Sequence, residues 1–102
     1  MRWLVLLALC FGGAELRAAE PVTIQIFTAT WCGSCPRMHK VGEQLQAEGW
    51  NVKFIDVDAR PKWSQREQIG ALPTTLVKHG TRELDRLVGA VPKETVLRRV
   101  SR

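Results

Sequence analysis

Two cysteines three residues apart are the residues of this 102-residue chain with the clearest chemical potential. Cys32 and Cys35 lie where an apolar, strand-like run gives way to a helix-like pattern. One helical turn brings positions i and i+3 together, and the free N–H groups and dipole at a helix start favour an anion. A thiolate is the nucleophile in disulfide exchange, and such sites lower a cysteine pKa to about 3.5–7.5. The spacing therefore predicts that Cys32 attacks a disulfide and that Cys35, one turn further in, resolves the mixed disulfide.

A metal-binding alternative stays open, because Cys-x-x-Cys is also half of a zinc site. A structural zinc needs four protein ligands, and the chain has no second such motif. The other candidate ligands are His39, four residues after Cys35, and His79, beside a turn glycine. Copper binding or delivery through Cys32 and Cys35, with His39 as a third ligand, is the alternative function, since thiolates suit Cu(I). We nevertheless expect His39 to be an exposed helix residue and the site to hold no metal.

The N-terminal segment differs in character from the rest of the chain. Arg2 precedes the uninterrupted apolar run Trp3–Phe11, and small or mixed residues follow, ending at Ala18-Ala19. This order is typical of a secretory signal, and as a helix such a run spans only about 14 Å of a roughly 30 Å hydrocarbon core. We expect Met1–Ala19, including Cys10, to be a signal peptide and residues 20–102 to be the exported domain, periplasmic if the protein is bacterial. An uncleaved N-terminal segment that acts as an anchor is the alternative.

Composition and charge limit the remaining classes of function. The length allows one domain, and 45% hydrophobic with 25% charged residues is ordinary for a globular protein. The net charge of +5 comes without a dense basic patch with stacking aromatics, so we expect no nucleic-acid partner. We also expect a monomer. Export would let the cysteine pair form a disulfide, but a bridge across so short a loop stabilises little. The pair is therefore predicted to be chemical rather than structural.

Hydrophobic periodicity predicts the elements that position the pair. In chain order they are a strand at Val22–Thr28, a helix from Cys32 to about Glu48, a strand at Val52–Val57, a short helix at Lys62–Ile69, a hairpin of Thr74–His79 and Glu83–Val88, and a last helix that begins near Pro92. The order βαβαββα predicts an α/β fold with a four-stranded mixed sheet flanked by helices.

These motifs, in this order and at these spacings, resemble the thioredoxin family. Trp31-Cys32-Gly33-Ser34-Cys35 is similar to the family's active-site motif, Leu72-Pro73-Thr74 to its cis-proline loop, and Val88-Gly89-Ala90 to the entry to its last helix. The resemblance covers Val22 to about Val100. It implies a thioredoxin-like fold that lacks the first β-α unit and has about the size of a glutaredoxin.

The resemblance also implies the site and the partners. Pro73 should be a cis proline whose loop offers backbone groups to an extended client segment. The apolar docking surface would consist of Trp31, Leu72, Pro73, Gly89 and Ala90. The implied reaction is exchange with a cysteine-containing client protein, without a cofactor, with electrons supplied by a membrane or soluble thiol–disulfide donor. The apolar Leu72 and the uncharged Gly33-Ser34 pair favour a reductase.

Two positions depart from the family pattern. Where thioredoxins usually bury an aspartate, six residues before the first cysteine, this chain has Ile26; where a lysine commonly pairs with that aspartate, it has Phe54. We therefore expect an apolar pocket below Cys35 without a general base. A desolvated thiol ionises less readily, so the mixed disulfide should resolve more slowly.

Overall fold

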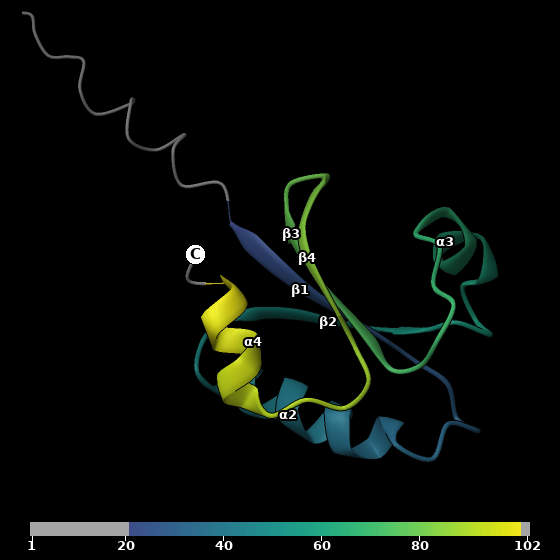
Figure 1. Ribbon diagram of the computed structural model, residues 1–102, viewed down its shortest axis with the longest axis horizontal. Coiled ribbons are helices and arrows are strands. Elements are labelled where there is room, and N and C mark those ends of the chain that lie inside the picture. The colour runs from purple at the N-terminus through teal and green to yellow at the C-terminus, as the bar shows by residue number, and fades with distance from the viewer. Residues whose placement is uncertain (1–20, 101–102) are drawn as a thin grey trace, which may run out of the picture.

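The computed structural model describes residues 21–100. Its elements are β1 (Val22–Thr28), α2 (Cys35–Ala47), β2 (Asn51–Asp56), α3 (Pro61–Arg66), β3 (Thr74–His79), β4 (Arg82–Val88) and α4 (Lys93–Val100) (Figure 1). Within this range the order is the predicted βαβαββα. The predicted signal peptide, Met1–Ala19, lies outside the described residues. No helix within residues 21–100 is long and apolar enough to cross a membrane.

The four strands form one mixed sheet in the order β2-β1-β3-β4. Strand β1 is parallel to β2 and antiparallel to β3, and β3 and β4 form the antiparallel hairpin. The predicted four-stranded mixed sheet is therefore confirmed. Because β1 has a neighbour on each side, its carboxyl end at Thr28 is a fixed platform from which the chain enters the cysteine motif.

Alternation of side chains along β1 divides the core between the two faces of the sheet. Ile24 and Ile26 are fully buried on the face that α2 and α4 cover, in a cluster with Met38, Leu45 and Val96. Phe27 points to the other face and meets Trp63 of α3 edge to face, with ring centroids 6.2 Å apart. Figure 1 shows α2 and α4 on one side of the sheet and α3 on the other.

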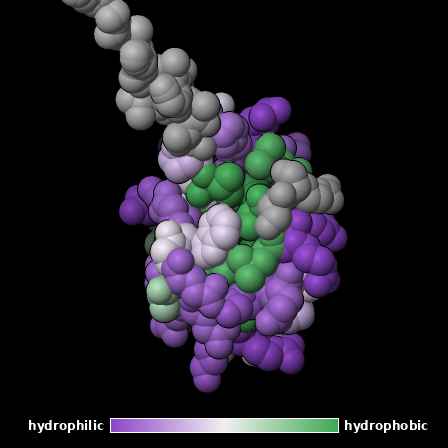
Figure 2. All heavy atoms as spheres, turned by 90° about the vertical axis from the view of Figure 1, so that its left-hand side faces the viewer, coloured by the Kyte–Doolittle hydropathy of each residue, from purple (hydrophilic) through white to green (hydrophobic). Residues whose placement is uncertain are grey.

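Residues 21–100 alone do not completely cover the core at the end where α4 lies (Figure 2). Figure 2 shows apolar side chains there, framed by hydrophilic ones. Partly buried apolar residues that pack against the α2/α4 side of the core include Trp50, Leu97 and Val100. A chain of this size buries only a modest core, so such partial exposure at its margin is expected.

Helix α2 lies unusually close to the sheet at Gly42. A Cβ atom at this position would lie 2.6 Å from Phe54 Cε1 and 2.7 Å from Ile26 Cδ1. Position 42 therefore requires glycine because a larger side chain would clash with the sheet, and not because of its backbone conformation. Ile26 and Phe54 are paired in register on neighbouring strands, so both family departures form one apolar surface beneath α2.

Two helix boundaries differ from the prediction by three residues. Helix α2 begins at Cys35 rather than Cys32, because Pro36 has no N–H to donate to the Cys32 carbonyl; Cys35 N–H makes a tighter turn to that oxygen at 3.4 Å. Helix α3 ends at Arg66 rather than Ile69, because Gln68 adopts a left-handed conformation with φ of 58°.

Candidate active site

The Sγ atoms of Cys32 and Cys35 form a disulfide across a Cα–Cα distance of 5.4 Å. A turn in which Cys32 N–H donates to Ala29 O at 3.2 Å presents Cys32 just before the helix. Cys35, in the first turn of α2, is only 3% exposed, whereas Cys32 is partly exposed. The bridge therefore has one sulfur that a partner can reach and one that is covered.

The start of α2 favours negative charge at the exposed sulfur. Ser34 occupies the N-cap without a side-chain capping bond, and the first turn contains no acidic residue. The exposed cations Arg37 and Lys40 line a shallow hollow together with Gly33 and Ser34. Free N–H groups and nearby cations stabilise a thiolate, so this environment suits a nucleophilic Cys32 once the bridge is reduced.

Trp31 stands beside the disulfide with 68% of its surface exposed. Its indole Nε1–H donates to Asp58 Oδ2 at 2.8 Å, which fixes the ring although little packs around it. Trp31, Cys32, Val57 and Leu72 are among the residues that line a groove of about 550 Å³. The groove joins the cysteine motif to the loop after α3. Asp58 is a site residue that sequence reasoning missed, since nothing in its spacing ties it to Trp31.

The Leu72–Pro73 peptide bond is cis, as the resemblance implies. The Pro73 ring is buried, and its carbonyl oxygen accepts a 2.8 Å hydrogen bond from Gly89 N–H. The predicted docking residues thus divide: Trp31 and Leu72 line the groove, while Pro73 and Gly89 join the two loops behind it.

Val88 is a further apolar residue at this edge of the site, and 60% of it is exposed. It pairs in register with Thr74, directly after the cis proline, and Ala90 is half-buried two residues later. An apolar residue at the solvent-facing end of a strand could have indicated that Val88 takes part in docking. The sequence-based prediction did not include Val88 among the docking residues.

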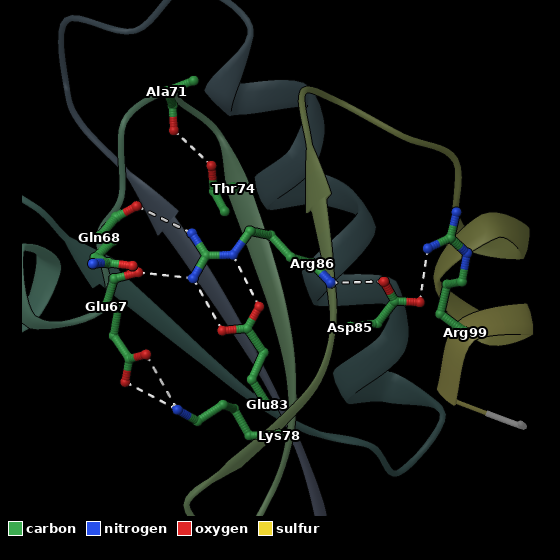
Figure 3. Close-up of polar contacts among 9 residues, drawn as sticks. All are labelled: Glu67, Gln68, Ala71, Thr74, Lys78, Glu83, Asp85, Arg86 and Arg99. Atoms are coloured by element: carbon green, nitrogen blue, oxygen red, sulfur yellow. Dashed lines mark hydrogen bonds and ion pairs between the residues drawn. The ribbon is translucent and has the colours of Figure 1, made fainter.

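Arg86 of β4 holds the start of the cis-proline loop (Figure 3). Its guanidinium donates to the carbonyl oxygens of Glu67 at 2.8 Å and Gln68 at 3.1 Å. The same group forms two bonds to the Glu83 carboxylate, at 2.9 and 3.0 Å. These bonds lower the pKa of Glu83 and raise that of Arg86. The left-handed turn at Gln68 is therefore stabilised by a side chain from the far edge of the sheet.

Two more contacts complete the anchoring of this loop (Figure 3). The largely buried Lys78 ammonium lies 3.0 Å from the Glu67 carboxylate. Thr74 Oγ1 donates to Ala71 O at 2.6 Å, on the other side of the cis proline. The segment that forms one wall of the groove is thus fixed at both ends before any client arrives.

A second cleft, of about 340 Å³, opens on the α2 side of the disulfide. It is lined by Thr28, Ala29, Thr30, Cys32, Cys35, Pro36, His39 and Asp56. The substitutions at Ile26 and Phe54 predicted an apolar pocket below Cys35 without a general base. His39 and Asp56 nevertheless bring an imidazole and a carboxylate to the cleft, so its wall is not apolar throughout.

His39 is held against the sheet rather than extended into solvent. Its ring stacks on Phe54 with centroids 4.1 Å apart and an interplanar angle of 21°. Its Nδ1 lies 3.4 Å from Glu43 Oε2, one turn along α2, and 47% of the side chain is exposed. It is exposed, as predicted, but it also belongs to the site. Within residues 21–100, no group of three or more His, Cys, Asp or Glu side chains is placed to hold a metal ion, so this geometry gives the copper alternative no support.

An open and a covered sulfur at the start of a helix, next to a cis-proline loop, are arranged for exchange with another disulfide. The class of protein is therefore a thiol–disulfide oxidoreductase with a thioredoxin-like fold. The sequence model described as Thioredoxin matches residues 13–102, and the chain belongs to the thioredoxin family.

Individual relatives agree with this assignment. The chain is 34% identical over 91 residues to thioredoxin M4, chloroplastic, of Arabidopsis thaliana, an alignment that covers 85% of this chain but only 46% of that relative. It is 33% identical over 94 residues to the thioredoxin of Mycobacterium tuberculosis, covering 89% of this chain and 80% of that protein. Among solved structures, thioredoxin NaTrxh from Nicotiana alata superposes with a TM-score of 0.74 at 27% identity, covering 86% of this chain and 80% of that one.

Proposed function

We propose that this protein is an exported thiol–disulfide reductase in which Cys32 is the nucleophile and Cys35 the resolving thiol. In the reduced protein the Cys32 thiolate attacks a client disulfide, forms a mixed disulfide and releases one client thiolate. Cys35 then attacks Cys32 Sγ, which restores the intramolecular bridge and releases the second client thiolate. The observation that carries the proposal is the unequal exposure of the two bridged sulfurs.

The client docks in the groove between the cysteine motif and the cis-proline loop. Its walls are fixed by the Trp31–Asp58 bond on one side and by the bonds of Arg86 on the other. A pre-formed groove with both polar and apolar groups in its wall suits an extended peptide segment around a cysteine, since little ordering is required on binding. Trp31 and Leu72 line this groove, Pro73 and Gly89 join its loops through their hydrogen bond, and Val88 and Ala90 extend the docking surface.

The residues between the cysteines support the proposed direction of electron flow. Gly33 and Ser34 carry neither charge nor an imidazole that would strongly stabilise the Cys32 thiolate and make the disulfide a strong oxidant. The oxidised form that results after each turnover needs electrons from a membrane or soluble thiol–disulfide donor. Outside the cytosol that donor must itself be supplied across the membrane.

The reduction potential tests the direction. The full chain, with Cys10→Ser so that only the pair reacts, is equilibrated against glutathione or dithiothreitol while Trp31 fluorescence reports the redox state. We expect a potential near that of thioredoxin, about −270 mV. A value of about −120 to −180 mV would make the protein an oxidase or isomerase, and the absence of a reversible couple would refute the oxidoreductase mechanism.

Export is tested separately. Residues 1–19 fused to a reporter that is active only outside the cytosol should give signal, and Leu7→Arg in the apolar run should abolish it. The mass of the mature protein then distinguishes a cleaved signal from an uncleaved anchor. A reporter that stays inactive in the unaltered fusion contradicts export while leaving the redox chemistry intact.

A further inference from the structure

The Cys35 thiol needs a proton acceptor, and the apolar side chains buried around it do not provide one. To attack the mixed disulfide it must lose a proton, yet the residue is 3% exposed and burial disfavours the thiolate. Ile26, on the strand below α2, is fully buried and has no group that accepts a proton. The acceptor must therefore lie in the cleft that the Cys35 side chain lines.

Besides the cysteines, that cleft is lined by two titratable side chains, His39 and Asp56. His39 is one helical turn from Cys35, so both side chains project from the same side of α2. The cleft has a volume of about 340 Å³, which is room for several water molecules. Thr28 and Thr30 add polar groups to its wall. It satisfies both conditions for a bridging water, which are room and polar partners.

The imidazole of His39 is oriented by contacts on two sides. Phe54 of β2 supports its face at a centroid distance of 4.1 Å, and Glu43 of α2 lies 3.4 Å from Nδ1. With Nδ1 directed at Glu43, Nε2 is the ring nitrogen left to accept a proton. From β2 the charged group at this cleft is Asp56, and neither Lys nor Arg lines it.

An imidazole suits this task better than the neighbouring carboxylate. A proton acceptor is most effective when its ordinary ionisation lies near the working pH, which holds for histidine side chains and not for aspartate. One oxygen of Asp56 is also occupied, since Oδ1 accepts the Asp58 N–H at 2.9 Å.

We propose that His39 is the proton acceptor for Cys35 during resolution of the mixed disulfide, an inference that rests on the proposed function. The Cys35 proton moves to His39 Nε2, directly or through one water, as the Cys35 sulfur attacks Cys32 Sγ. The Cys32–Cys35 bond forms, the Cys32–client bond breaks and the client sulfur leaves with the electron pair. The client is reduced and the cysteine pair oxidised. His39 then gives its proton to solvent or to the departing thiolate, and in the reverse direction it protonates Cys35.

The two chemical steps can be measured in one experiment. The reduced full chain carrying Cys10→Ser is mixed with excess 5,5′-dithiobis(2-nitrobenzoate) in a stopped-flow instrument. The first thionitrobenzoate released reports attack by Cys32, and the second reports resolution by Cys35. For His39→Gln we expect the second phase to slow by about tenfold or more at pH 7, with the first phase unchanged within about twofold. His79→Gln, the same substitution in the β3–β4 hairpin, is the matched control and should alter neither phase.

Two further readouts separate proton transfer from a structural role. The pH dependence of the second phase should differ between the wild type and His39→Gln. In His39→Ala, added imidazole should restore the second phase with a dependence on imidazole concentration. Circular dichroism establishes that each variant is folded.

Several outcomes would overturn the inference. These are an unchanged second phase in His39→Gln, equal slowing of both phases, failure of imidazole to restore His39→Ala, or loss of the second phase in Asp56→Asn but not in His39→Gln. If the wild-type chain itself releases only one thionitrobenzoate, the proposed redox function fails rather than the role of His39.

Discussion

The amide of Gly89 donates a 2.8 Å hydrogen bond to the carbonyl oxygen of Pro73, which joins the end of β4 to the cis-proline loop. Gly89 makes this bond with φ of 95°, and a Cβ there would meet no atom within 4 Å. Substitution of Gly89 is therefore restricted by its backbone conformation and not by a lack of space.

Gly89→Ala should destabilise the protein by about 1–2 kcal/mol, the cost of the left-handed region for a residue with a Cβ. The free energy of unfolding in urea measures this cost. Gly70→Ala is the matched control, since Gly70 also has open space around its Cα but no positive φ. Equal stability of both variants would contradict the conformational argument.

Gly42→Ala should also destabilise the protein, but through overpacking. The added methyl would lie 2.6 Å from Phe54 and 2.7 Å from Ile26, so α2 or the Phe54 ring must move. We expect a net loss of about 1–2 kcal/mol after the better helix propensity of alanine is counted. Because Phe54 supports His39, the second phase of the thionitrobenzoate assay should slow as well. A more stable variant would mean that the helix is not seated as closely as described.

Trp31→Ala should weaken client binding more than folding. The indole is 68% exposed, so its loss removes little core contact, but it forms one wall of the groove. Loss of an exposed aromatic anchor weakens binding by about 1–2 kcal/mol, roughly fivefold to thirtyfold in KM for a protein disulfide. Trp63→Phe, which alters the edge-to-face contact with Phe27, should instead lower the unfolding midpoint and leave KM unchanged. The reverse pattern would contradict the groove as the docking site.

Arg86→Met should loosen the cis-proline loop. It removes the donors to the Glu67 and Gln68 carbonyl oxygens and leaves Glu83 without its partner. We expect a loss of about 2–3 kcal/mol and faster proteolysis between residues 67 and 73. Arg99→Met is the control: it removes a 2.7 Å ion pair with Asp85 away from the loop, a loss of about 0–1 kcal/mol. Similar losses in both variants would mean that the loop does not depend on Arg86.

Stability should depend on pH through Glu83. The hydrogen bonds of Arg86 lower the pKa of this carboxyl below its ordinary value of 4.5 in the folded protein. The unfolded chain therefore takes up the proton first as the pH falls. The stabilisation is complete above pH 4.5 and is lost as the pH drops through the lower, folded value.

Glu83→Gln isolates this effect. The pair is about one-third exposed, so the wild type should exceed the variant by only ~0.5 kcal/mol at neutral pH. Urea unfolding at a series of pH values should show that difference shrinking below pH 4.5. A difference that stays constant into the acid range would assign the stabilisation to packing rather than charge.

Much of the fold could be predicted from the chain. The predicted strand Val22–Thr28 coincides with β1, and its alternation places Ile24 and Ile26 on one face and Phe27 on the other even though both faces are buried. The motif resemblance correctly implied the cis bond at Pro73, which no local rule would select. The predicted start of α2 was wrong by three residues, although the missing N–H of Pro36 could have indicated the later start.

The parts that escaped prediction depend on contacts between distant elements. The pairing of Trp31 with Asp58 joins residues 27 apart, and Arg86 reaches the end of α3 across 19 residues. No pattern in a single sequence specifies such pairs. His39 was placed on an exposed helix face from its spacing alone. Its position at the cleft depends on the strand register that places Phe54 beneath the imidazole ring, and this register is seen only in the structure.

The strand order also affects how readily the protein aggregates through the edges of its sheet. The two outer strands, β2 and β4, are the places where an unfolded chain could be added by backbone pairing. Strand β4 alternates charges along its length, with Arg82, Glu83, Asp85 and Arg86, and β2 carries Lys53 on its solvent side. Charged edges resist strand addition, so aggregation with a partly unfolded client is disfavoured there, and contact is directed to the sulfur end of the sheet.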